Sequence, residues 1–239
     1  NCPTKIGMTG TLRDTKCHEM VLTGMFGPVY EATNIRELQA TNRIAKATIN
    51  IVVLEYPSED RERLFPYDKE KKKRVRDYQQ EIDFLIGHEA RNEAILKLVN
   101  TLKGNTLCMF ERVEQQGLVL HEMFKTRGRK TAYLIHGGID TEDRAEIRRI
   151  VEQATESVLS ASYGTLGTGV SIRRLHNMIL ALAGESIIRT LQTLGRMLRK
   201  AKDKQTVAVF DFVDDLTFKG NKGGEYPNYK LLHGLKRIE

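Results

Sequence analysis

The sequence predicts an α/β fold, in which a parallel β-sheet carries helices on both faces. Short runs of β-branched and other apolar residues alternate with longer segments whose apolar residues recur at helical spacing, and the connections are short. Strands and helices that alternate in this way form a doubly wound parallel sheet. The 239 residues, 40% of them hydrophobic and 29% charged, can bury a core without disulfides or a metal.

The first 48 residues are predicted to stand apart from this sheet. Residues 5–8 have the pattern of a lone strand, and residues 14–26 that of a short helix that ends near Gly27. Residues 31–48 are polar and have no clear period, so we interpret them as a linker.

From residue 49 onward the elements alternate. Apolar runs predict strands over residues 49–56, 106–110, 131–135, 157–160, 177–182 and 205–213. Helical spacing predicts two helices within 70–103, separated at Gly87, and further helices over 113–125 and 186–198. Asp140, with Asp143 three residues on, predicts a capped start for another helix.

Composition excludes several classes of protein. No apolar run approaches the roughly 18 residues of a membrane span, and the first residues lack the apolar core of a signal peptide. The three cysteines are scattered and odd in number, which favours reduced thiols and a cytoplasmic location. The six histidines are dispersed, so neither a metal site nor a Ser-His-Asp hydrolase is expected.

The net charge of +7 is a moderate indication of nucleic-acid binding. Six of the eight residues 69–76 are basic, and an ordinary solvated face is as good an interpretation of this run as a DNA contact. The chain has no tryptophan, so a platform for base stacking is not favoured. If nucleic acid is bound, its phosphate backbone is the expected target.

The chain contains no Gly-Lys dipeptide and therefore no P-loop of the usual kind for binding a nucleotide. Residues 207–215 imitate a magnesium-binding strand, because an apolar run ends in Asp211, Asp214 and Asp215. Without a P-loop, a core strand with a solvated acidic exit is the favoured interpretation.

Two segments have phosphate-binding character. Arg196 and Arg199 are three apart in a predicted helix after Gln192, so both guanidinium groups can face one polyphosphate. Residues 161–172 follow a strand and combine glycines with hydroxyls, and backbone N–H groups in such a turn can surround a phosphate. By itself, each segment also fits an ordinary basic face or turn.

Taken in order, these segments resemble the second motor lobe of a superfamily-two helicase. Their amino-acid sequences are similar to those of phage members of the family. The resemblance covers nearly the whole chain. Residues 8–14 (MTGTLRD) resemble motif III, 107–112 motif IV, 136–137 motif IVa, 161–172 motif V and 192–199 motif VI.

The resemblance implies a RecA-like fold and an ATP-dependent helicase or translocase that acts on branched DNA in phage recombination, repair and replication. Residues 1–30 would be a remnant of the first lobe, 31–48 the linker and 49–239 the second lobe. ATP with Mg²⁺ would lie between the lobes and be bound mainly by the first. Without that lobe, this chain is expected to be inactive as an ATPase.

The resemblance also assigns roles to residues. Arg196 and Arg199 would reach the γ-phosphate, with Gln192 preceding them in the same motif, and Gly169 and Ser171 would lie near the nucleotide. Thr9 and Thr11 would couple the two lobes. The residues that would bind the DNA backbone, single-stranded or branched, are Arg112, Gly137, Ser162, Gly164 and Thr165. No membrane contact is implied. The alternative is a nucleic-acid-binding or regulatory module that has a helicase-lobe fold and no motor activity.

Overall fold

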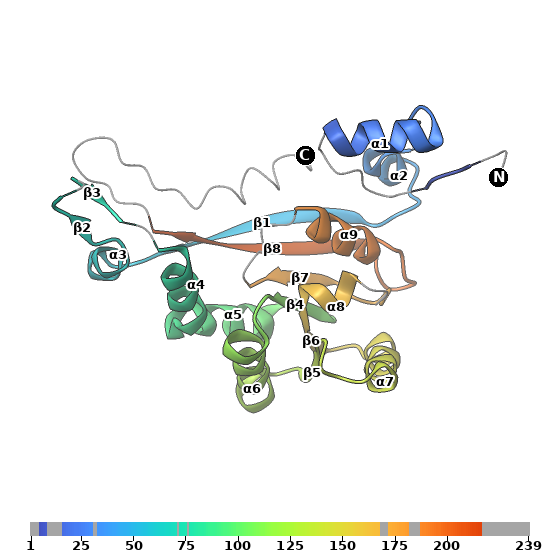
Figure 1. The fold of residues 1–239 in the computed structure, drawn as a ribbon. Coiled ribbons are helices and arrows are strands. Elements are labelled where there is room, and N and C mark those ends of the chain that lie inside the picture. The colour runs from blue at the N-terminus through green and yellow to red at the C-terminus, as the bar shows by residue number, and fades with distance from the viewer. Residues whose placement is uncertain are drawn as a thin grey trace.

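The fold is a parallel sheet between two layers of helices, as the sequence predicts (Figure 1). The computed structural model of the chain describes residues 5–8, 16–30, 33–70, 72–75, 77–167, 172–181 and 187–216. The sheet has six strands in the order β1-β8-β7-β4-β6-β5, and every pairing within it is parallel. These strands are β1 (Lys46–Glu55), β4 (Thr106–Phe110), β5 (Thr131–Ile135), β6 (Ser157–Ser162), β7 (Asn177–Leu180) and β8 (Thr206–Asp215).

Two helices precede β1, and the others occupy the segments between these strands. They are α1 (Lys16–Phe26), α2 (Ile35–Ala40), α3 (Ser58–Leu64), α4 (Tyr78–Gly87), α5 (Glu89–Thr101), α6 (Leu118–Arg127), α7 (Thr141–Gln153), α8 (Tyr163–Gly167) and α9 (Ile187–Met197). A short π-helix, η1 (Val113–Gly117), leads into α6. No helix within the described ranges is long and apolar enough to cross a membrane.

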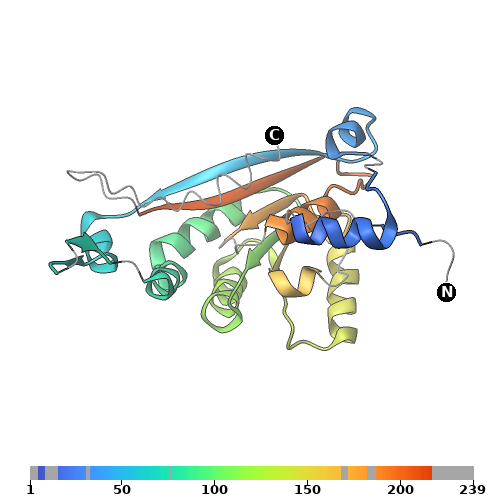
Figure 2. The same ribbon diagram turned by 45° about the horizontal axis from the view of Figure 1, so that its top comes forward.

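Alternate side chains of each strand enter different core clusters. In β4, Leu107 and Met109 face α7 and α9, whereas Cys108 faces α5 and α6. In Figures 1 and 2, α5 and α6 lie on one side of the central strands and α7 lies on the other. Both faces of the sheet are therefore buried, which is why its strands are apolar on both sides.

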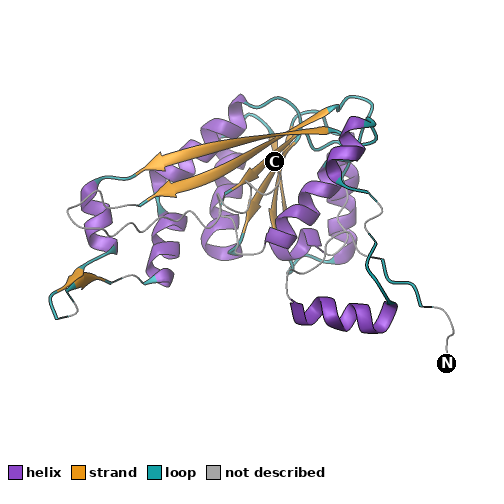
Figure 3. Ribbon diagram, turned by 90° about the horizontal axis from the view of Figure 1, so that it is seen from above, coloured by secondary structure: helices purple, strands orange, loops and turns teal. Residues whose placement is uncertain are grey.

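A smaller core cluster lies beyond the carboxyl ends of β1 and β8, which extend past the other strands toward α3 and α4 (Figure 3). Here the sequence-based prediction of helix from residue 70 is wrong. Strands β2 (Tyr67–Asp68) and β3 (Lys73–Arg74) form a hairpin instead. Helix α4 begins only after Asp77, whose side chain accepts hydrogen bonds from the Gln79 and Gln80 N–H groups at 2.9 and 3.3 Å.

The region before the sheet also differs from the prediction. Residues 5–8 form no strand, since no described strand pairs with them. The predicted linker, 31–48, contains helix α2 and the first residues of β1. Asn34 caps α2 by accepting a 2.9 Å hydrogen bond from the Glu37 N–H group, a short-range signal that apolar periodicity does not detect.

Two further predictions need correction. The helix predicted over 113–125 begins as η1, and Gly117 packs directly against the ring of Phe110. A Cβ atom at Gly117 would lie 2.4 Å from that ring, so only glycine fits. Asp140 does precede α7, but its side chain makes no capping hydrogen bond.

Candidate functional site

The carboxyl ends of β4, β6 and β5, which are adjacent in the sheet, carry the predicted DNA-binding residues. Arg112 follows β4 and is partly exposed. Its guanidinium donates hydrogen bonds to Gln79 Oε1 at 2.8 Å and Asp83 Oδ1 at 3.2 Å, both on α4. Gly137 lies in an exposed turn after β5, and no atom lies within 4 Å of the position its Cβ would take. Among the predicted DNA-binding residues, this edge therefore presents the Arg112 guanidinium, paired with Asp83, and the exposed backbone at Gly137.

The turn after β6 is more closed than the sequence suggests. The hydroxyl groups of Ser162 and Thr165 lie 2.7 Å apart in a hydrogen bond, and both residues are buried. Gly164 between them is exposed and has free space around it. The Ser162–Thr165 pair thus stabilises the turn, and the surface that this turn presents is the backbone at Gly164. A phosphate contact by the two hydroxyls stays a prediction.

The predicted nucleotide-binding residues lie on and after α9. Gln192 is exposed and Arg196 is partly buried on the helix. The helix ends at Met197, so Arg199 is not on the same rigid element as Arg196, contrary to the prediction. Arg199 lies in the bend that follows, where its N–H group donates a long 3.4 Å hydrogen bond to the Arg196 carbonyl. Helix α9 contacts α8, so the arginines and the glycine-rich turn belong to one side of the sheet.

The two sets of residues lie at different ends of the strands. The Leu198 carbonyl, next to Arg199, accepts a 2.8 Å hydrogen bond from Ala45, which immediately precedes β1. Arg199 is therefore near the amino end of β1, whereas Arg112 and Gly137 follow the carboxyl ends of their strands and Ser162 is the last residue of β6. Arg199 is thus separated from Arg112 and Gly137 by the length of the sheet. Gln192 and Arg196, however, lie on α9, which contacts the helix α8 that carries Gly164 and Thr165. Gly169, Ser171, Thr9 and Thr11 lie outside the described residues, so their roles stay predictions.

Sequence reasoning missed a buried polar network at the carboxyl ends of β1 and β8. Arg91, on α5, donates to Asp214 at 2.8 and 3.1 Å, and the Tyr56 hydroxyl donates to the same carboxylate at 2.6 Å. All three residues are buried. The predicted solvated acidic exit of β8 is therefore wrong. The signal was present in α5, because Arg91 is in register with the apolar residues Ile95 and Val99.

Asp211, three residues before Asp214, is buried without a hydrogen-bond partner for either carboxylate oxygen among the described residues. Burial, assisted by the charge of Asp214, raises the pKa of Asp211 to about 6, and Arg91 opposes this shift. The same two factors, burial first and then the Asp214 charge, raise the pKa of the Tyr56 hydroxyl.

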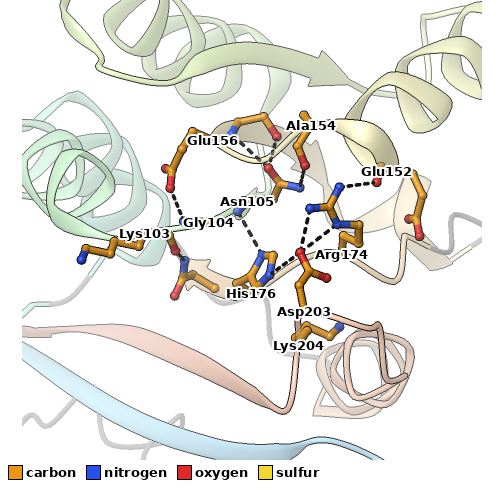
Figure 4. A network of polar contacts seen from close by, with 12 residues as sticks. Lys103, Gly104, Asn105, Glu152, Ala154, Glu156, Arg174, His176, Asp203 and Lys204 are labelled. Atoms are coloured by element: carbon orange, nitrogen blue, oxygen red, sulfur yellow. Dashed lines mark hydrogen bonds and ion pairs between the residues drawn. The ribbon is translucent and has the colours of Figure 1, made fainter.

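A second polar network closes the amino edge of the sheet (Figure 4). The Asn105 side chain joins β4 to β6 and α7 through Ser157 and the carbonyls of Val151 and Ala154. His176 Nδ1 accepts a 3.1 Å hydrogen bond from the Asn105 N–H group, which requires an unprotonated Nδ1, and burial lowers the pKa of His176. These hydrogen bonds tie the amino ends of β4, β6 and β7 together. Within the described ranges, no group of acidic, histidine and cysteine side chains could hold a metal ion.

An all-parallel sheet with this pattern of covering helices is the fold of RecA-like helicase lobes, and comparison with known proteins confirms the resemblance to superfamily-two helicases. The chain is 33% identical over 247 residues to the ATP-dependent DNA helicase uvsW of Enterobacteria phage T4. The chain is therefore similar to this helicase over its whole length. The match takes in 100% of this chain and 47% of the phage protein, so the chain spans about half the length of this curated relative.

Comparison with solved structures supports the same resemblance. The crystal structure of T4 UvsW matches 92% of this chain and 42% of its own, with a TM-score of 0.62 and 32% identity. The Type ISP restriction-modification enzyme LlaBIII, solved bound to DNA, matches 89% of this chain and 15% of its own with a TM-score of 0.57, and at 14% identity it supports the fold alone. No model of a known protein family matches the chain.

Proposed function

We propose that this chain forms the second motor lobe of an ATP-dependent DNA helicase or translocase that acts on branched DNA. Its activities would be fork regression, branch migration and R-loop unwinding in phage recombination, repair and replication. The observation that carries the proposal is the similarity to T4 UvsW over the whole chain, including both segments with phosphate-binding character.

The residues of this chain fit one part of an ATP site. Arg199 is exposed and Arg196 is partly exposed, so guanidinium groups can approach a polyphosphate from this lobe. No described cluster of acidic residues could hold the magnesium ion. On the resemblance to helicases, Mg²⁺ and most contacts to ATP are assigned to the first lobe, and bound ATP would supply the free energy for movement along DNA. Arg199 would stabilise charge on the transferred phosphoryl group, a role worth about 10³–10⁵ in rate.

The DNA contact is proposed at the carboxyl edge of the sheet. Arg112 would bind a phosphate, and the open backbone at Gly137 and Gly164 would let a strand approach closely. These contacts do not read base edges, so binding would be independent of sequence and would weaken as salt rises. A translocase requires such contacts, because it must release and rebind successive phosphates.

Two variants of the intact enzyme test these assignments. Arg199→Ala should abolish DNA-stimulated ATP hydrolysis and leave the Kd for forked DNA unchanged. Arg112→Ala should weaken binding to forked and linear DNA alike and make the salt dependence shallower, with a loss of about one in the logarithmic slope. Unchanged turnover in Arg199→Ala would remove this residue from the ATP site.

The chain by itself supplies a further test. The 239 residues alone should hydrolyse no ATP, with or without DNA, because they lack a P-loop. Measurable hydrolysis by the purified chain would contradict the proposal. DNA binding by an intact protein that shows no DNA-dependent hydrolysis would favour the alternative, a nucleic-acid-binding module without a motor.

A further inference from the structure

The bend that carries Arg199 belongs to a longer turn, residues 198–205, which we call the arginine turn. It connects α9 to β8. Inside the fold it is held by Lys204, whose ammonium group is buried and donates a 2.6 Å hydrogen bond to the carbonyl of Met197, the last residue of α9. Burial lowers the pKa of Lys204 to about 8, against the opposing charges of Glu152 and Asp203. The inner side of the turn is thus fixed to the lobe itself.

The outer side of the arginine turn is fixed to a different part of the chain, residues 41–45, which we call the connecting segment. This segment leads from α2 into β1. The Ala45 N–H group donates to the Leu198 carbonyl at 2.8 Å, and the Lys46 N–H group donates to the Gln205 carbonyl at 3.0 Å. Lys200 donates to both the main-chain oxygen and the side-chain oxygen of Asn42, each at 2.5 Å.

Asn42 is held in a defined conformation for this contact. It has a φ of +56° and follows Thr41, the C-cap of α2. Its N–H group donates to the Gln39 carbonyl at 3.0 Å, and that of Arg43 donates to the Leu38 carbonyl at 2.8 Å. This pair of hydrogen bonds is the Schellman motif, in which asparagine replaces the usual glycine in the left-handed position. The motif fixes the direction of the Asn42 main-chain oxygen.

Arg199 is therefore flanked on both sides by contacts to the connecting segment, because residues 198 and 200 each bind it. We propose that Lys200 and Asn42 form a positioning clamp that holds the arginine turn, and with it Arg199, in the geometry needed to reach a nucleotide phosphate. The inference rests on the proposed function. It also gives the connecting segment a role in the motor, because a movement of the N-terminal elements is transmitted to Arg199 through Lys200.

The clamp should affect catalysis more than stability. Lys200 and Asn42 meet at the surface, where one such contact adds little to folding free energy. A small displacement of a group that acts on the reacting phosphate can nevertheless slow a reaction by up to about 10²-fold. In the intact enzyme, Lys200→Met should therefore lower kcat for DNA-stimulated ATP hydrolysis about tenfold, with KM for ATP, Kd for forked DNA and Tm unchanged.

Three companion variants sharpen the test. Lys200→Arg should restore most of the rate, since a guanidinium can bridge both oxygens. Asn42→Gly retains the left-handed turn and the main-chain oxygen and removes the side-chain oxygen, so it should lower kcat only about threefold. Lys202→Met, at an exposed position in the same turn, is the matched control for loss of one charge and should behave as wild type.

The double variant Lys200→Met/Asn42→Gly should be no slower than Lys200→Met alone, because the two residues make one contact. Wild-type turnover in Lys200→Met, or losses that multiply in the double variant, would overturn the clamp. If Lys200→Met does not fold, wild-type turnover in Asn42→Gly overturns it in the same way. A failure of the proposed function would give a different result. In that case the wild-type enzyme would lack DNA-dependent ATP hydrolysis, or Arg199→Ala would leave the hydrolysis rate unchanged.

Discussion

Replacement of Asp211 by asparagine should make the chain more stable at neutral and alkaline pH. The Asp211 side chain is fully buried in β8, between β1 and β7, and neither carboxylate oxygen has a hydrogen-bond partner among the described residues. A buried carboxylate without partners favours its neutral form, and the nearby Asp214 charge adds to this preference. Arg91 partly offsets it, but that guanidinium is already bonded to Asp214.

The sign and the size of the effect follow from the pKa of Asp211, which burial raises from 3.8 to about 6. Because the folded state binds the proton more tightly, the stability that this group provides is fully present below pH 3.8 and is lost as the pH rises to about 6. The difference between the two pKa values corresponds to about 3 kcal/mol. Of this contribution to the free energy of unfolding, about 2 kcal/mol should be lost between about pH 4.5 and 8.

The assay is denaturant unfolding of the wild-type chain and of Asp211→Asn at about pH 4.5, 6 and 8. The free energy of unfolding of the variant should rise by about 2 kcal/mol relative to that of wild type over this range. All other titrating groups are common to both proteins, so their effects cancel in the comparison. Asp143→Asn, at an exposed position on α7, controls for loss of one negative charge. Parallel stability curves for wild type and Asp211→Asn would refute the reasoning.

Three other substitutions or probes test the packing. Arg91→Met should lower the free energy of unfolding by about 3–5 kcal/mol, measured by denaturant titration, because it leaves the Asp214 carboxylate buried without its cation. Burial raises the pKa of the Cys108 thiol to about 12, so peptide mapping should find this cysteine unlabelled by a thiol reagent at about pH 8 until the chain unfolds. Gly117→Ala should cost about 1–3 kcal/mol, measured as a fall in thermal or denaturant stability, because the new methyl group would overlap the buried Phe110 ring.

Each of these has an outcome that would contradict it. A loss below about 1 kcal/mol in Arg91→Met would mean that Asp214 finds other partners. Rapid labelling of Cys108 in the folded chain would show that the α5–α6 face opens. Gly87→Ala is the control for Gly117→Ala, since its Cβ meets nothing within 4 Å and should add up to about 1 kcal/mol to helix stability. Equal effects at the two glycines would exclude the steric argument.

The strands and the fold class could be predicted because the signal is local. Residues 106–110 and 131–135 are predicted as strands and form β4 and β5 with the same bounds. The predicted break at Gly87 lies within one residue of the observed one, because α4 ends at Gly87 and only His88 separates it from α5. A buried parallel strand must be apolar on both faces, so its pattern is visible without knowledge of its neighbours.

The predictions fail where a polar contact between distant residues determines the structure. Arg91 and Asp214 are 123 positions apart, and the acidic end of β8 alone suggests a solvated surface. Lys200 and Asn42 are 158 positions apart. Periodicity depends only on neighbouring residues and cannot detect this contact, so it predicts residues 31–48 as a linker. Periodicity reports which face of an element is buried and carries no information on which polar groups meet there.

The sequence alone determined that this chain is a parallel α/β lobe with helicase-like motifs, since apolar spacing and the order of short motifs are properties of neighbouring residues. Only the tertiary structure decided how those motifs are arranged. It places Arg112, Gly137 and Gly164 at the carboxyl edge of the sheet and Arg199 beyond α9, against the segment that enters β1. The reason is physical: parallel pairing and the burial of unlike polar groups depend on residues that are far apart in the chain, and their free energy is gained only when the chain is folded.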